Sequence, residues 1–155
     1  GNQRLFIFIR INVMIKISKE LKAVIQSSWF TIENGLYVYA KVTNVHTPEK
    51  HLIVTRDSDE ITVVTKTSNL SELGDYERNP DNWVLLNIKC GNPFYCKGFL
   101  AAIASVFASE EIDITLTSTY TNDYLMVQEH NKEQAISVLT GIGFMQKNVR
   151  PENKT

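Results

Sequence analysis

The order of apolar segments in the second half of the chain constrains the fold more than any other sequence feature. In chain order they are a strand-like run at 83–90, a helical pattern at 98–109, alternating runs at 112–117 and 124–127, a second helical pattern at 131–141 and a short run at 144–149. Alternation with period two is typical of strands, and recurrence every three to four residues is typical of helices. The predicted order is β-α-β-β-α-β, which gives an antiparallel sheet with both helices on one face.

The two helices of this segment have recognisable faces and ends. Asn131 is expected to cap the second helix, supported by Gln134 three residues later. Gly141 and Gly143 then provide a stop signal. The apolar face of the first helix is predicted to consist of Leu100, Ile103, Ala104, Phe107 and Ala108.

The first half of the chain resembles a reduced copy of the second. Ser18 can cap a helix that extends to about Trp29, and 34–35 is a turn signal. The remaining predicted elements are a strand at 36–45, a short helical turn at 47–50, two strand-like runs at 52–55 and 61–65, and a polar loop at 67–82 with one helical turn near 70–73.

The length of 155 residues suits one ordinary domain or two half-size modules that share a core. We predict an α+β protein of two ferredoxin-like modules, at 18–75 and 83–149. Small modules bury little surface by themselves. We therefore expect the two to pack on each other or to dimerise.

Residues 1–17 are predicted to be an N-terminal extension or an extra strand. Their apolar run at 5–9 is interrupted by Arg10 and is too short to cross a membrane. No small-residue cleavage site follows it, as a signal peptide would require. Two interpretations stay open: Met14 is the natural start, or the segment is a true β-strand.

Charge and cysteine content exclude several functions. The formal net charge is -1 and basic residues are scattered, whereas nucleic-acid binding normally requires a basic face. Two cysteines, Cys90 and Cys96, are too few for a disulfide framework and do not have zinc-site spacing. We expect free thiols in a reducing cytoplasm, with no metal, cofactor, nucleic acid or membrane partner.

No catalytic constellation is evident in the sequence. Cys96 lies near a predicted helix N-terminus, where a thiol can be activated, but a nucleophile also needs a base. His46, His51 and His130 are distant in sequence, and no Gly-rich phosphate loop is present. We therefore predict that the chain is not an enzyme.

Three segments resemble a known family. The residues NPFYCKGFLA at 92–101 and STYTNDYLMV at 118–127 are similar to two motifs of ACT-type proteins of the tandem, aspartate-kinase-like regulatory group. DEITVV at 59–64 is similar to a third, and the cytosolic arginine sensors use related tandem ACT modules. The chain departs from the pattern at Lys97, where the family has a small or hydroxyl residue, and at Thr121 and Asn122, which replace an Asp-Thr pair.

The resemblance implies a ligand site at the turn before the first helix. Helix N–H groups and the helix dipole favour an anion such as an amino-acid carboxylate. Asp123 is the natural acceptor for an α-amino group, with Ser118, Thr119 and Asn122 adding hydrogen bonds. The predicted ligand-binding residues are Cys96, Lys97, Gly98, Phe99, Leu100, Ser118, Thr119, Asn122 and Asp123.

The function predicted from this resemblance is regulation. We expect a small ligand, an amino acid, to bind and to change an oligomeric or domain arrangement. The expected partner is a second copy in a homodimer or another ACT module. The alternative is an interaction or scaffold domain that binds no ligand and pairs through its sheets.

Overall fold

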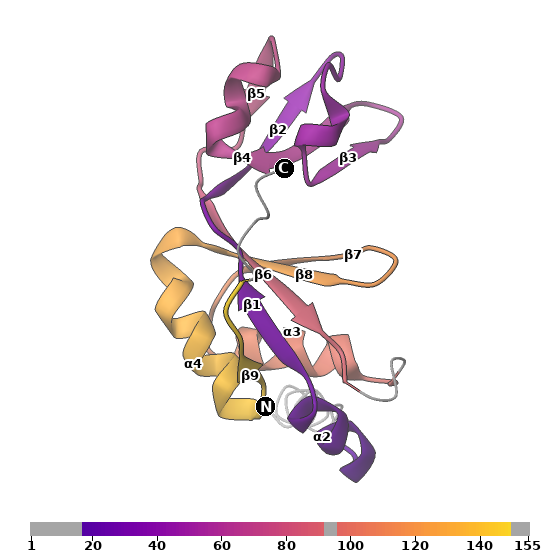
Figure 1. Ribbon diagram of the computed structural model, residues 1–155, viewed down its shortest axis with the longest axis vertical. Coiled ribbons are helices and arrows are strands. Elements are labelled where there is room, and N and C mark those ends of the chain that lie inside the picture. The colour runs from indigo at the N-terminus through magenta and orange to yellow at the C-terminus, as the bar shows by residue number, and fades with distance from the viewer. Residues whose placement is uncertain (1–16, 92–95, 150–155) are drawn as a thin grey trace, which may run out of the picture.

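The computed structural model describes residues 17–91 and 96–149. Residues 1–16 of the predicted N-terminal extension (1–17) and the residues at 92–95 lie outside this description. Within it, the chain forms helices, short 3₁₀ turns and strands that join one mixed sheet (Figure 1). The predicted α+β class, with helices on one face of the sheet, is confirmed.

The second half (residues 83–149) has the predicted order. Its elements are β6 (Trp83–Lys89), α3 (Phe99–Ser109), β7 (Ile114–Ser118), β8 (Asp123–Gln128), the 3₁₀ turn η3 (Glu129–Asn131), α4 (Lys132–Ile142) and β9 (Met145–Gln146). β8 pairs antiparallel with both β6 and β7. The order is therefore β-α-β-β-α-β.

A strand from the start of the chain is inserted into this sheet. β1 (Trp29–Ile32) runs antiparallel to β6 and parallel to β9, so the strand order is β9-β1-β6-β8-β7. The sequence predicted no strand here, because four residues directly after a helix show too little alternation to be recognised. The helix before it, α2 (Lys19–Gln26), begins as predicted, with the Ser18 hydroxyl accepting from the Leu21 amide at 3.0 Å.

α2 and β1 pack with the second half of the chain. Leu21, Val24, Ile25 and Phe30 belong to the same buried cluster as the apolar faces of α3 and α4. The division into modules at 18–75 and 83–149 remains a prediction, but the packing places residues 19–32 on the core of the later segment. The prediction had assigned residues 19–32 to the first module, 18–75, from their position in the sequence alone.

The first half (residues 37–78) has the same element order with its helices reduced to 3₁₀ turns. Its elements are β2 (Tyr37–Val42), η1 (Pro48–Lys50), β3 (Ile53–Arg56), β4 (Ile61–Lys66), η2 (Thr67–Glu72) and β5 (Tyr76–Arg78). The strands lie in the order β5-β2-β4-β3, which matches β9-β6-β8-β7 once β1 is left out. β5 falls in a segment that the sequence predicted to be a loop.

The strands of the second half have two buried faces. Val84, Leu86 and Ile88 of β6 point toward the helices, and the alternating residues Trp83 and Leu85 point to the opposite side. That opposite side packs against β2, β3 and β4 of the first half. Each fully buried aliphatic side chain contributes about 1.5–3 kcal/mol, so both faces stabilise the arrangement.

Two local predictions need correction. On α3, Ile103 and Phe107 are buried as predicted, but Leu100 is 39% exposed and Ala108 is exposed. Phe99 and Ala102 complete the buried face instead. The helix contains four alanines at 101, 102, 104 and 108. Because alanine is tolerated on both buried and exposed faces, these residues do not identify the buried face from sequence.

The predicted capping contact of the last helix is also not formed. Asn131 is the residue before α4, but its side chain makes no capping hydrogen bond. The chain enters α4 from the η3 turn with Asn131 at φ −97° and ψ 6°, whereas a capping residue requires extended backbone.

Candidate functional site

A cavity of about 370 Å³ lies between the start of α3 and the tip of the β7–β8 hairpin. We call it the hairpin pocket. Its walls come from two segments, 96–101 and 118–123, that are separated in sequence by most of α3 and β7. The lining residues are Cys96, Gly98, Phe99, Leu100, Ala101, Ser118, Thr119, Tyr120, Thr121, Asn122 and Asp123.

The helix wall of the pocket presents backbone donors. Gly98 precedes α3 with φ +88°, a left-handed conformation that favours glycine, and it has no side chain to cap the helix. The amides of Phe99 and Ala102 donate to the carbonyls of Cys96 and Gly98. The N–H groups of Leu100 and Ala101, in the first turn, have no intrahelical acceptor. Together with the helix dipole they make this wall electropositive.

The hairpin wall presents acceptors. The Ser118 hydroxyl donates to Oδ1 of Asp123 at 2.6 Å, and the Thr119 amide donates to the carbonyl of Asn122 at 2.8 Å. Oδ1 of Asn122 is buried and has no partner among the described residues. The pocket therefore has a donor wall and an acceptor wall that face each other.

The structure brings eight of the nine predicted site residues to this pocket. Lys97 is the exception, since it is exposed and does not line the cavity. The prediction omitted Ala101, Tyr120 and Thr121, which also line it. Helix geometry gave a signal for Ala101, because the third helical residue presents its amide at the same end. Tyr120 and Thr121 are hairpin-tip residues, and no sequence signal separated them from an ordinary turn.

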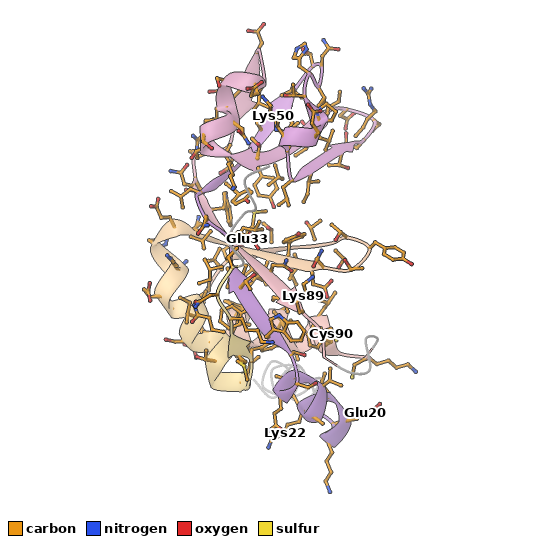
Figure 2. The ribbon with its side chains drawn as sticks, viewed as in Figure 1. Glu20, Lys22, Glu33, Lys50, Lys89 and Cys90 are labelled. Carbon is orange, nitrogen blue, oxygen red and sulfur yellow. The ribbon has the colours of Figure 1, made fainter. Side chains whose placement is uncertain are left out.

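The two cysteines lie close to the pocket. Burial raises the pKa of the Cys90 thiol above its ordinary value, and the nearby Asp123 and Cys96 add to this effect. Cys96 lines the cavity, where its Sγ donates to the carbonyl of Lys97 at 3.8 Å. Figure 2 shows Lys89 and Cys90 in the same half of the molecule as α2, away from Lys50.

The histidines of the described chain lie elsewhere. Nδ1 of His51 is 2.9 Å from the Thr65 hydroxyl in the first half, and His46 lies beside Gly74. His130 is in η3, at the start of α4. None of them lines the hairpin pocket, so residues 17–91 and 96–149 place no Cys–His pair there.

Within the described ranges, no three His, Cys, Asp or Glu side chains are grouped so that they can hold a metal ion. No helix of the described segments is long and apolar enough to cross a bilayer.

The sequence match falls on the part of the chain that carries this pocket. Residues 78–141 match the family model of the ACT domain. The matched segment includes β6, α3, β7, β8 and most of α4, and therefore every residue that lines the pocket. The match shows that this segment is similar to an ACT domain. No curated protein sequence matches the chain.

Similar solved structures agree with an ACT-type fold. A protein of unknown function from Vibrio cholerae has a TM-score of 0.70 and 20% identity, covering 81% of this chain and 97% of that one. A protein from Agrobacterium tumefaciens has a TM-score of 0.65 and 20% identity, with 83% and 98% covered. The ligand-free regulatory subunit of aspartate kinase from Thermus thermophilus has a TM-score of 0.55 and 10% identity, with 77% and 97% covered. At these identities the similarity concerns the fold.

Proposed function

We propose that the chain is a regulatory ACT-domain protein that binds an α-amino acid in the hairpin pocket. The observation that carries this proposal is the pairing of a donor wall with an acceptor wall across one cavity. A free amino acid needs both, because its two charged groups are joined through a single carbon. The volume of about 370 Å³ is within the usual range for small-ligand sites.

The carboxylate of the ligand is assigned to the N-terminus of α3. The amides of Leu100 and Ala101 supply hydrogen-bond donors, and the aligned peptide dipoles supply roughly half a positive charge at that end. Gly98 allows the ligand to approach the backbone closely. Phe99 is buried beneath this turn and ties it to the core.

The ammonium group of the ligand is assigned to the hairpin. Ser118 donates to Oδ1 of Asp123, and Oδ2 has no partner among the described residues, so we assign Oδ2 as the acceptor for the ligand. Oδ1 of Asn122 also has no described partner, but it is buried, so Asp123 is the principal acceptor. Charge-assisted hydrogen bonds of this kind are the stronger ones in proteins.

Regulation follows from the position of the pocket between two elements. A ligand that binds both walls favours the arrangement that holds them closest, and it shifts the population toward that arrangement. The reduced first half acts, in this proposal, as a second ACT-type module in tandem. The resulting change is transmitted to a second copy in a homodimer or to a partner ACT module. The aspartate kinase regulatory subunit with a similar fold supports a regulatory assignment.

A thermal-shift screen of the twenty amino acids at millimolar concentration tests the proposal. At least one amino acid is expected to raise the melting temperature of the wild-type protein. The shift should disappear in Asp123→Asn, which keeps the side-chain shape and removes the charge. Asp113→Asn, at an exposed position outside the pocket, is the matched control and should keep it. No shift with any amino acid, or a shift that survives Asp123→Asn, contradicts the proposal.

One observation favours the alternative function, pairing through the sheet. β7 pairs only with β8 among the described strands, and its sequence ITLTS carries no charge that would protect a free edge. A dimer that forms equally well with and without amino acids, and that is lost in Thr117→Pro, would favour the interaction domain. A monomer at all concentrations would exclude it.

A further inference from the structure

The two halves of the chain meet through a small set of contacts. β2 and β6 share one bridging pair, Tyr37 with Trp83. Around this pair lies a buried cluster with residues from both halves, among them Val64, Leu85 and Met126. Side chains of this junction therefore connect the first half to the sheet that carries the pocket.

Tyr39 makes such a connection. Its ring lies edge-on to Trp83, with centroids 5.9 Å apart and planes at 80°. Its hydroxyl donates to Oγ1 of Thr115 at 2.7 Å, across 76 residues of sequence. Burial raises the pKa of Tyr39, while the Thr115 hydrogen bond opposes that rise. The hydroxyl thus keeps its proton and remains a donor at neutral pH.

Thr115 lies on the strand that forms the hairpin wall of the pocket. β7 is only five residues long, and it joins Thr115 to Ser118, which orients Asp123. Among the described strands β7 pairs with β8 alone, and every residue in it is at least partly exposed. Ile114 and Leu116 hold it on the helix side, and Tyr39 holds it on the other side.

We propose that Tyr39 is a positioning residue for the hairpin pocket, through which the first half fixes the hairpin wall. Without the Tyr39 hydroxyl, β7 loses its anchor on the face of the sheet that packs against the first half, and Ser118 and Asp123 become more mobile. Conversely, a ligand that draws the hairpin toward α3 acts on β7, and through Thr115 it acts on Tyr39 of the first half. The effect of Tyr39 on ligand binding rests on the proposed function, whereas its positioning of β7 does not.

The first experiment needs no ligand. Amide hydrogen exchange is measured on the full chain for the wild type, Tyr39→Phe and Thr115→Val. Each substitution should raise exchange of the β7 amides about fivefold, the equivalent of one ordinary hydrogen bond. β6 amides should be unchanged, and the double variant should add nothing further. Tyr76→Phe, at a 42% exposed tyrosine of the first half, is the matched control and should have no effect.

Two exchange results would overturn the inference. Unchanged exchange in β7 would show that the contact does not hold the strand. An equal rise in β6 and β7 would show that Tyr39 contributes only to global stability.

The second experiment uses whichever of the twenty amino acids gives the largest thermal shift. Tyr39→Phe should weaken its binding by about the same fivefold factor, and Tyr76→Phe should not. Unchanged affinity in Tyr39→Phe would refute the positioning role. If no amino acid shifts the wild type, the proposed function fails, and the exchange result still decides whether Tyr39 positions β7.

Discussion

The hydroxyl of Ser118 donates a 2.6 Å hydrogen bond to Oδ1 of Asp123, its direct partner across the β7–β8 hairpin. One oxygen of the candidate ammonium acceptor is therefore fixed, and the other has no hydrogen-bond partner among the described residues. A ligand that binds there does not have to order the carboxylate, which lowers the entropic cost of binding.

Ser118→Ala should weaken amino-acid binding about fivefold, because Asp123 then loses its fixed orientation. The free energy of unfolding should change by less than about 0.5 kcal/mol, since both side chains are at the surface. Calorimetric titration and urea unfolding measure the two effects. Ser109→Ala is the control, because that hydroxyl donates to a helix carbonyl at the far end of α3. Equal affinity in the two variants would contradict the prediction.

Gly91→Ala should destabilise the protein by about 2–3 kcal/mol. A Cβ at this position would collide with Oγ of Ser27 and approach the Ser27 backbone at 2.9 Å. The Gly91 amide also donates to the Ser28 hydroxyl at 2.7 Å, so the backbone has little freedom to withdraw. Gly141→Ala, within α4 and with open space around it, should instead stabilise by about 0.5–1 kcal/mol. Urea unfolding of both variants tests this opposite sign.

Phe30→Ala should cost about 3–5 kcal/mol and should loosen the second half of the chain. Phe30 is fully buried in the cluster of α3 and α4, although it precedes the first half in sequence. Leu73→Ala, in the buried cluster of β2 and β4, should loosen the first half instead. Hydrogen exchange resolves the two halves. If Phe30→Ala raised exchange mainly in β2–β4, the assignment of β1 to the second half would be wrong.

Stability should decrease as the pH falls through about 6.5. Burial lowers the pKa of His51 from its ordinary value of 6.5, against the opposing effect of Glu49 and Glu72. The unfolded chain therefore binds a proton at a pH where the folded protein does not, which favours unfolding. Nε2 of His51 is buried without a described partner, so a proton there gains no hydrogen bond. Urea unfolding at several pH values gives the free energy of unfolding as a function of pH. Near pH 6.5 this dependence should be weaker in His51→Asn than in the wild type. His130→Asn, at an exposed position, should keep the wild-type dependence.

Iodoacetamide labelling should distinguish the two cysteines. Burial and the nearby Asp123 raise the pKa of Cys90, so its thiolate fraction and labelling rate should be low at neutral pH. A bound amino acid should slow the labelling of Cys96, which lines the pocket, and should leave Cys90 unchanged. Mass spectrometry of labelled peptides gives both rates. Fast labelling of Cys90 would show that burial does not protect it.

Most of the second half could be predicted from sequence because its signals are local. The alternation in 112–117 and 124–127, with polar residues between them, gave the hairpin. The motif resemblance implied the residues of both pocket walls, and the structure brings eight of them together. The buried face of α3 could not be predicted exactly from sequence, because alanines on several sides of the helix carry little information about burial.

The elements that sequence missed depend on distant partners. β1 is a strand because β6 and β9 lie on either side of it, and Trp29 pairs with Lys89 and Met145. β5 is three residues long and exists by pairing with β2. The contact of Tyr39 with Thr115 spans 76 residues, and no local pattern could indicate it.

The insertion of β1 between β6 and β9 also sets the order in which the chain can fold during synthesis. β2, β3 and β4 find their partners within about thirty residues and can pair as soon as they leave the ribosome, because short loops close at low entropic cost. β1 emerges earlier but pairs later, since β6 is made only after the whole first half. Its apolar side chains, and those of α2, therefore remain exposed during this interval. That interval is when the nascent protein is most vulnerable to aggregation and most in need of a chaperone.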